Sequence, residues 1–533
     1  MKAVIPMLFL LTMVLSIKAT ENKTGINLYR SGLYGPAKVF FLKQEKALTD
    51  PAQKTEACYY LGNSYLMLGM PDSAAVYYQK GVEIAPEYPY NYIGQGKLQM
   101  KVNQTAGKAL LEQAESMKGY KKDAAVLSEI AVAYLYAGDY AGAWDCIARA
   151  KKYAPSGEIV YLTEGDLLMA EKKTNEACTK YDMAIYYSSD CIPAYLKLTD
   201  IYASTNPASA LAHLEKSMGI DAGFPGNWFY QGEVNRSVGN YKKAAEAYRR
   251  FIESGLSDTD TRLRYADCLY FSGKYDEALP VIRVVLAKDP DNVVGMRLQA
   301  YALAKKERNA GGLESIRKFM TSVPENKLIF QDYLCYAEQL SYAKEYGQAL
   351  EQYQRALKLD KKRTNLYQDM ADIRVRMKDY SGALADYDQY LASVKAPAAE
   401  DMLKFGKCYY NMGAQDSVAD SRNATLHKAD SVFAILTEMV PDSYVGYFWR
   451  ARTNSLLDPE STAGLAKPFY EKIIEIAEKT PNRYVTELVE SYKYLGYYNY
   501  VTHHMDAAKA CFAKVLEYIP NDEVSQRALK EIK

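Results

Sequence analysis

Residues 59–86 read YYLGNSYLMLGMPDSAAVYYQKGVEIAP, and this arrangement of small, aromatic and turn residues decides the fold. The stretch has no histidine and only one aspartate and one glutamate, so it does not resemble an active site. Its two apolar segments are separated by GMPDS, where glycine and proline are typical of the end of one helix and the start of the next. The stretch therefore predicts a pair of packed helices.

The same arrangement returns along most of the chain. In a frame that begins at Thr55, glycine stands at position 8, alanine at position 20, tyrosine at position 24 and proline at position 32. Thirteen such frames begin at residues 55, 89, 124, 158, 192, 225, 259, 293, 330, 364, 399, 444 and 489, and most steps are 33 to 35 residues. Position 8 is glycine or alanine in every frame except the one that holds Thr199. A chain of 533 residues is too long for one ordinary core, and stacked repeats provide the alternative.

This order of small, small, aromatic and proline residues, with a period near 34, resembles the tetratricopeptide repeat (TPR) from about Thr55 to Pro520. The resemblance implies an all-α fold, a right-handed α-α superhelical solenoid of about 13 TPR helix pairs with end caps. The small residues let two helices approach closely, and the bulky residue at position 24 fills the space beside them. The resemblance also implies a concave groove lined by the first helix of each pair, which binds proteins.

Five parts are expected along the chain. Residues 1–20, with Lys2, an apolar run and Ala19, are typical of a signal peptide, with an uncleaved anchor as the alternative. Residues 21–54 are expected to be a divergent repeat that caps the array, 55–398 a regular array of about ten units, 399–522 further units with insertions, and 523–533 a polar capping helix. The run has no cysteine near its end, which favours the periplasm or cell envelope without a lipid anchor.

The two insertions lie near residues 413–428 and 457–467. Insertions in solenoids are expected to form loops on one face, where partners often bind, and tolerated drift is the alternative.

Composition and motifs argue against several function classes. The net charge of +1 gives no general attraction to nucleic acid. The sequence has no phosphate-binding loop, no GxSxG and no HExxH, and its adjacent His503 and His504 fall in a predicted turn. We therefore expect no enzyme activity, no catalytic residue, no cofactor and no metal.

The groove is the remaining place for function. Position 9, which the resemblance places on the groove, reads Asn63, Lys97, Val132, Asp166, Asp200, Glu233, Asp267, Tyr301, Glu338, Asp372, Lys407, Arg452 and Tyr497. Six of the seven central units from Asp166 to Asp372 are acidic, and aromatic residues lie nearby. The hypothesis is that this central acidic row binds basic segments of protein partners. Its residues are Asp166, Asp200, Glu233, Asp267, Glu338, Asp372, Phe229, Phe271 and Tyr342.

Three alternatives stay open. The first is that the acidic row is only a solvated polar stripe. The second is that the 49 tyrosines belong to a glycan or peptidoglycan binding module. The third is an enzyme with its site in the carboxy-terminal insertion. The partner, the pathway and the oligomeric state do not follow from the sequence.

Overall fold

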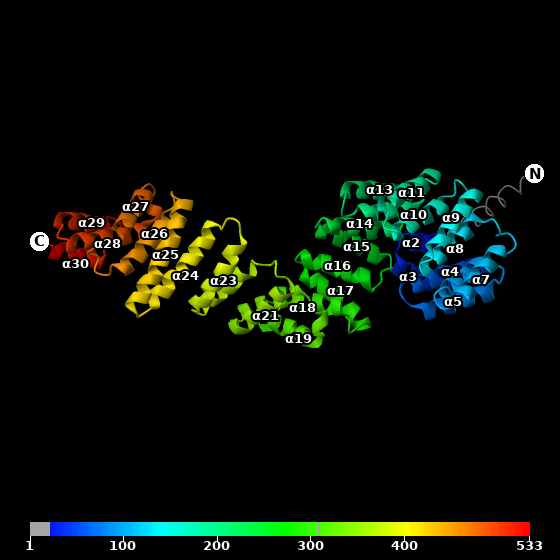
Figure 1. Cartoon of the computed structure of the whole chain (residues 1–533), viewed down its shortest axis with the longest axis horizontal. Helices are drawn as coiled ribbons and strands as arrows, with labels where there is room; N and C mark the ends of the chain where they lie inside the picture. Colours follow the sequence, from blue (N-terminus) through cyan, green and yellow to red (C-terminus); the bar gives the residue numbers. More distant parts are fainter. Residues whose placement is uncertain (1–21, 308–309, 533) are drawn as a thin grey trace, which may run out of the picture. The chain divides into compact units, whose positions relative to one another are not determined.

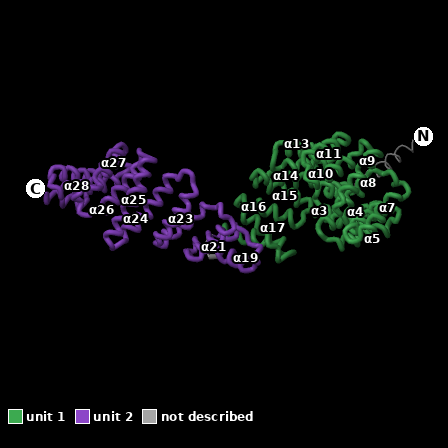
Figure 2. Tube along the Cα trace, in the orientation of Figure 1, with its two compact units in different colours: residues 1–306 green, residues 307–533 purple. Residues whose placement is uncertain are grey.

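The computed structural model describes residues 22–307 and 310–532, and its chain divides into two compact units (Figures 1 and 2). Unit 1 holds the described residues up to 306 and unit 2 those from 307 onward. The described residues form helices and no strand. The signal peptide predicted for residues 1–20 lies outside the described residues. No described helix combines the length and the hydrophobicity that a membrane span requires.

Unit 1 consists of successive helices that pack in pairs. They are α2 (Lys23–Arg30), α3 (Tyr34–Gln44), α4 (Pro51–Met67), α5 (Pro71–Ile84), α6 (Pro89–Gln99), α7 (Gln104–Ser116), α8 (Ala124–Ala137), α9 (Tyr140–Tyr153), α10 (Glu158–Ala170), α11 (Thr174–Tyr187), α12 (Ile192–Tyr202), α13 (Pro207–Ile220), α14 (Pro225–Ser237), α15 (Tyr241–Glu253), α16 (Thr259–Phe271), α17 (Tyr275–Lys288) and α18 (Val293–Lys306).

Unit 2 continues the same pattern. Its helices are α19 (Ala310–Ser322), η1 (Glu325–Lys327), α20 (Phe330–Tyr342), α21 (Tyr346–Leu359), α22 (Leu366–Arg376), α23 (Tyr380–Ser393), α24 (Ala399–Gln415), α25 (Ala419–Met439), α26 (Tyr444–Leu457), α27 (Lys467–Ala477), η2 (Pro481–Arg483), α28 (Val485–Val501), α29 (Met505–Tyr518) and α30 (Glu523–Glu531). The even-numbered helices from α4 to α28 lie at the thirteen predicted frames, so the all-α solenoid is confirmed.

Close packing within a pair depends on the small residue at position 8. A Cβ atom added to Gly165 would lie 2.4 Å from the ring of Tyr181, and one added to Gly232 would lie 2.7 Å from the ring of Tyr248. Both tyrosine side chains are almost fully buried. The bulky residue at position 24 therefore occupies the space that the small residue leaves open, as predicted.

The turn between the two helices of a pair uses the left-handed backbone region at position 15. Glycine occupies it at Gly69, Gly138, Gly239 and Gly273, with φ between 74° and 81°. Lys172, Lys344, Lys378 and His503 adopt the same conformation with φ of 61° to 63°. His503 is thus an exposed turn residue, and its conformation is what this repeat requires at that place.

The insertion near residues 413–428 does not form a loop, and the expectation of a loop there is wrong. Its residues lengthen α24 to 17 residues and α25 to 21 residues, with a connection of only three residues between them. The leucine Leu426 is fully buried, so the added turns are part of the packed helix pair. The second insertion is a loop, in which the buried carboxylate of Asp458 accepts a hydrogen bond from the backbone N–H of Gly464 at 2.8 Å.

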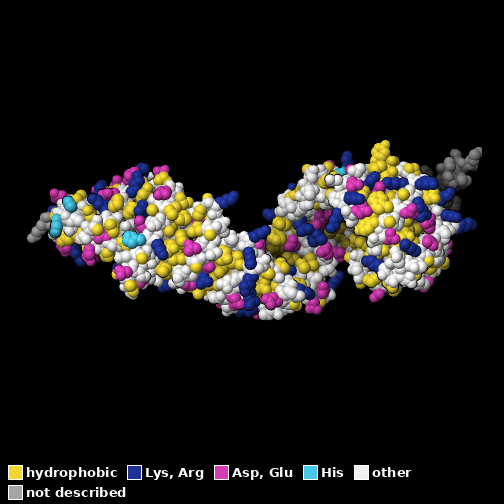
Figure 3. All heavy atoms as spheres, in the orientation of Figure 1, with side chains coloured by type: hydrophobic (Ala, Val, Ile, Leu, Met, Phe, Trp, Pro, Cys, Tyr) yellow, Lys and Arg dark blue, Asp and Glu magenta, His cyan; other side chains and the backbone are white. Residues whose placement is uncertain are grey.

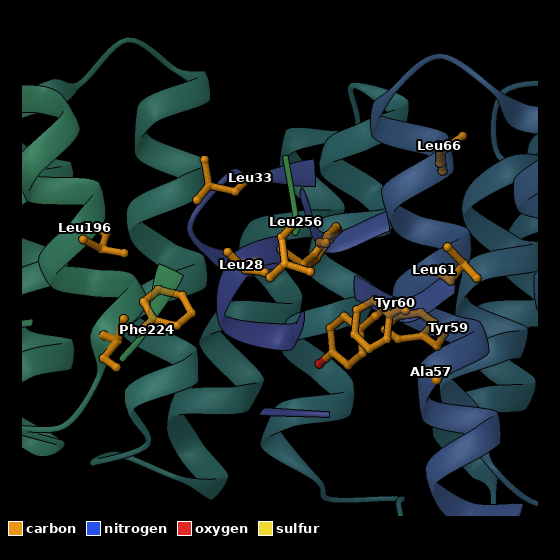
Figure 4. Packing of buried hydrophobic residues seen from close by; sticks show 14 of the residues in the cluster. Leu28, Leu33, Ala57, Tyr59, Tyr60, Leu61, Leu66, Leu196, Phe224 and Leu256 are labelled. Carbon is orange, nitrogen blue, oxygen red and sulfur yellow. The ribbon is translucent and has the colours of Figure 1, made fainter. Parts of the chain in front are cut away.

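Helices α2 and α3 do more than cap the first pair. They pack against α4, as a cap would, and α2 also contacts α12, four repeats further along the chain. Figure 4 shows Leu28 and Leu33 of this segment between Leu196 and Phe224 on one side and Tyr60 on the other. The amino-terminal helix pair therefore lies inside the concave surface of unit 1 and joins distant repeats in one hydrophobic core.

Polar contacts fix the same segment on both sides. The Tyr230 hydroxyl of α14 donates a hydrogen bond to the backbone carbonyl of Ser31. The Lys43 Nζ donates to the carbonyl of Gly255 at 2.6 Å. On the α4 side, the Arg30 guanidinium donates to the Tyr60 hydroxyl at 3.0 Å. The first two contacts join residues 199 and 212 positions apart, so the amino-terminal helices bridge distant repeats of unit 1.

This bridge predicts a long-range effect of a change in α2. Leu28→Ala removes a fully buried side chain and is expected to cost about 2–5 kcal/mol. Because α2 packs on α12, amide hydrogen exchange is expected to accelerate in α12 and α14 as well as in α4. The control Leu211→Ala changes a leucine that is 46% exposed on α13 and should leave exchange unaltered. Acceleration confined to α3 and α4 would mean that the segment is only an end cap.

Candidate partner-binding surfaces

A buried tyrosine hydroxyl recurs beside position 9. Tyr181 donates a hydrogen bond to Asp166 at 2.7 Å, Tyr387 donates to Asp372 at 2.7 Å, and Tyr248 donates to Glu233. In each pair the two residues are 15 positions apart. In the first repeat Tyr78 makes the same bond to Asn63 at 2.8 Å. The acceptor at position 9 therefore satisfies a hydroxyl that packing has buried.

A basic residue from the next repeat neutralises each of these carboxylates. Lys197 lies 2.7 Å from Asp166, Arg264 lies 2.9 Å from Glu233, and Lys404 lies 2.9 Å from Asp372. Burial lowers the pKa of Lys197, but the charge and hydrogen bond of Asp166, together with Tyr34 and Asp200, outweigh this effect and the pKa is raised overall. These three members of the predicted acidic row thus hold neighbouring repeats together.

Asp200 and Asp267 differ from the other carboxylates of the row in unit 1. Position 24 of their repeats is Glu215 and Ile282, so neither repeat supplies a tyrosine hydroxyl. Among the described residues, neither carboxylate has a hydrogen bond or an ion pair within 4 Å. Asp200 is exposed at the concave surface, yet surrounding protein limits its hydration. This desolvation raises its pKa, the charge of Glu233 adds to the effect, and Lys197 and Arg264 oppose it. Desolvation likewise raises the pKa of Asp267.

Two clefts flank the amino-terminal helices in unit 1. The first, of about 620 Å³, lies between α2 and helices α4, α10 and α12, and its lining includes Arg30, Glu56 and Asp190. The second, of about 370 Å³, lies between the start of α3 and helices α12, α14 and α16. We call the second the α3 cleft, and its lining residues are Gly32, Leu33, Tyr34, Gly35, Pro36, Leu68, Asp200, Phe229, Tyr230, Glu233, Asp258, Asp260, Thr261 and Arg264.

The predicted site residues fall into separate groups. Asp200, Glu233 and Phe229 meet in the α3 cleft, and Asp166 and Asp267 lie on the neighbouring helices α10 and α16. Phe271 is 56% exposed and stacks on Tyr241 with ring centroids 4.8 Å apart, and it does not line the cleft.

The remaining predicted residues belong to unit 2. Tyr342 is 55% exposed. Glu338 is half-buried on α20, and its charge adds to burial and Asp369 in raising the pKa of Tyr353. Asp372 accepts the hydrogen bond from Tyr387 and pairs with Lys404, as described above.

Sequence reasoning missed the contribution of Tyr34 and Leu33 to the α3 cleft. The sequence pattern predicts a cap for their segment, LYRSGLYGPAKVFFLK, because the segment lies outside the thirteen frames. Its high content of large apolar residues is the one sequence signal that it packs on more than one neighbour.

Figure 3 shows basic and acidic side chains interspersed over the visible surface of each unit, with no large field of one sign. Among the described residues, no group of three or more histidine, cysteine, aspartate or glutamate side chains could hold a metal ion. The eight cysteines are free thiols, seven of them buried. Desolvation raises the pKa of Cys58 to about 11 and that of Cys268 to about 12, so these thiols stay protonated at neutral pH.

Comparison with known families matches two parts of the chain. Residues 55–88 and residues 231–293 each match a family model described as tetratricopeptide repeat. No curated protein matches the sequence.

Several solved structures are similar to parts of the chain. The carboxy-terminal part of a TPR repeat-containing protein from Cytophaga hutchinsonii is 26% identical, with a TM-score of 0.43, and the match covers 50% of this chain and 99% of that one. A tetratricopeptide repeat protein from Parabacteroides merdae is 17% identical, with a TM-score of 0.34 and coverage of 44% and 92%. YrrB, described as a TPR protein with an unusual peptide-binding site, is 16% identical, with a TM-score of 0.29 and coverage of 34% and 92%.

Replacement of a paired carboxylate and replacement of an unpaired carboxylate in the acidic row should change the stability of the fold in opposite directions. Asp166→Asn leaves Lys197, whose side chain is 18% exposed, without its counter-charge and should lower the free energy of unfolding by roughly 1–2 kcal/mol at neutral pH. Asp200→Asn should raise it, because the ionised carboxylate is disfavoured in the folded state.

The pH dependence follows from the raised pKa of Asp200. The folded protein binds this proton more tightly than the unfolded chain, so the group stabilises the fold at low pH. That contribution is lost as the pH rises from the ordinary carboxyl range through the raised pKa. Urea unfolding at several pH values should therefore show the advantage of Asp200→Asn at neutral pH and its disappearance in acid. Equal destabilisation by both substitutions at neutral pH would contradict this distinction.

Proposed function

Because the chain is a tetratricopeptide repeat protein, we propose that it is a non-enzymatic scaffold that binds protein partners, and that its α3 cleft takes a lysine or arginine side chain of a partner. The family supports the first part of this proposal. The observation that carries the second part is the carboxylate of Asp200, which lines the cleft without a hydrogen bond or ion pair among the described residues.

The charges around the cleft favour a cationic ligand. The lining of the cleft includes four carboxylates, Asp200, Glu233, Asp258 and Asp260, and one cation, Arg264. Four negative charges against one positive charge leave an excess of three. An ammonium or guanidinium group that reaches Asp200 would offset the cost of its desolvation.

The walls of the cleft suit the stem of such a side chain. Phe229 packs edge-on against Tyr230 and Phe251, with centroid distances of 5.4 and 5.7 Å, so its ring is held in place. Leu68 on the rim is 39% exposed. Lysine and arginine stems pack on such apolar surfaces while their charged ends reach a carboxylate.

We also propose that the scaffold is exported to the periplasm or cell envelope. The pattern of Lys2, the apolar run and Ala19 supports this location. Sequencing the amino terminus of the protein purified from its native cells tests it. A start near residue 21 is expected, and a start at Met1 would contradict cleavage.

Site-specific crosslinking tests the function of the cleft. Leu68 is replaced by a photoreactive p-benzoylphenylalanine in native cells, and the crosslinked partner segment is identified by mass spectrometry. The proposal expects a segment with lysine or arginine beside the crosslinked residue, and it expects Asp200→Asn to remove the crosslink. Since Asp200→Asn should stabilise the fold, such a loss does not arise from unfolding.

The matched control is Glu215→Gln, which removes one exposed negative charge from α13 in the same repeat. The crosslink should persist in this variant. A crosslinked segment without basic residues, or one that forms equally well with Asp200→Asn, would refute the assignment of the cleft.

A further inference from the structure

Position 9 is basic in two successive repeats of unit 2. Lys407 stands there on α24 and Arg452 on α26, and these two helices contact each other. The Arg452 guanidinium forms two hydrogen bonds to Glu490, at 2.8 and 2.6 Å. Lys407 has no carboxylate within 4 Å among the described residues. The pair of cations is therefore only half neutralised.

Aromatic rings, and not an acid, hold the Lys407 ammonium. Its Nζ lies 4.7 Å from the ring centroid of Trp449. Trp449 is itself fixed, since it stacks on Phe433 at 5.8 Å and packs edge-on against Tyr410 at 5.2 Å. The guanidinium of Arg452 lies 4.3 Å from the centroid of Phe448. The aromatic rings thus position the Lys407 ammonium, but they offer no carboxylate oxygen to accept hydrogen bonds from its N–H groups.

Lys407 differs from three other cations on the first helices of the repeats. Lys197, Arg264 and Lys404 each pair with a carboxylate of the preceding repeat. Lys404 lies one turn before Lys407 on the same helix, so the missing partner is specific to Lys407 and not to α24. Desolvation and the charge of Arg452 both lower the pKa of Lys407. The negative charge of an added carboxylate would oppose both effects.

We infer that Lys407, Trp449 and Arg452, with Tyr410 and Phe448 beside them, form a docking surface for a protein segment that carries an aspartate or glutamate next to an apolar residue. The Lys407 ammonium donates hydrogen bonds to the carboxylate of that residue. Phe448 and Tyr410 pack against its apolar neighbour. This surface lies in unit 2 and does not depend on the proposed role of the α3 cleft.

The local charge selects this ligand class. Lys407 and Arg452 contribute two positive charges and Glu490 removes one, which leaves a single positive charge. One side-chain carboxylate matches it. A phosphate group or a nucleic acid would bring two or more negative charges to a place with one cation to receive them.

Peptide binding to the full-length protein tests the inference. The probe is a fluorescein-labelled peptide with an amidated carboxy terminus that carries one glutamate between leucines, and its partner probe has glutamine in place of this glutamate. Fluorescence anisotropy should show binding of the glutamate peptide about tenfold tighter than binding of the glutamine peptide. Higher ionic strength should weaken the glutamate peptide selectively.

Three variants locate the binding. Lys407→Gln should weaken the glutamate peptide about fivefold or more, and Lys407→Arg should retain most of the affinity. The matched control Lys428→Gln makes the same change of charge at an exposed position on α25 and should have no effect. Circular dichroism during thermal unfolding checks that all three variants fold.

Several results would overturn the inference. Equal binding of the glutamate and glutamine peptides by the unaltered protein is one of them. Absence of glutamate-peptide binding up to about 1 mM is another. Unchanged affinity of folded Lys407→Gln, or equal weakening by Lys428→Gln, would show that the contact lies elsewhere.

Discussion

A tyrosine that fills the space between two helices brings a hydroxyl group into the core, and a buried hydroxyl needs a partner. In this protein the partner is the residue at position 9, as in Tyr181 with Asp166 and Tyr387 with Asp372. The carboxylate, which is partly buried, is in turn paired with a cation that the next repeat supplies. In the repeat with Arg452 at position 9, the cation stands at position 9 and the next repeat supplies the carboxylate. Glu490 of α28 accepts a hydrogen bond from the Tyr470 hydroxyl and also pairs with Arg452. The buried tyrosine of one repeat is thus linked, through the acceptor at position 9, to a charged residue of the next repeat.

This constraint separates structural charges from charges available to a partner. Three of the six carboxylates of the acidic row, Asp166, Glu233 and Asp372, accept a hydrogen bond from the tyrosine at position 24. Asp200 and Asp267 occur where that tyrosine is missing, and Lys407 occurs where an aromatic ring replaces the usual carboxylate. In unit 1 the amino-terminal helices also occupy the concave surface and leave clefts on either side. The two proposed contact points are therefore small and chemically distinct, an anionic one in unit 1 and a cationic one in unit 2.

The repeat period, the small residues at position 8 and the buried ring at position 24 follow from local spacing, and they could be predicted because each lies within one frame. The hydrogen bond and the ion pair of Asp166 could not be predicted from position 9 alone, because they depend on Tyr181 and on Lys197 of the next frame. The contact between Tyr230 and Ser31 spans 199 residues and has no periodic signal at all. The helical insertion near residue 420 was missed because its polar sequence is typical of a loop, although Leu426 anchors it in the core.

A double-mutant cycle between Tyr181→Phe and Asp166→Ala tests the central claim most directly. If the hydroxyl and the carboxylate depend on each other, the two changes in the free energy of unfolding should differ from additivity by about 1–2 kcal/mol. The cycle between Tyr181→Phe and Asp200→Ala should be additive within about 0.5 kcal/mol. Additivity in the first cycle would contradict the claim, because the acidic row would then be independent of the tyrosine packing.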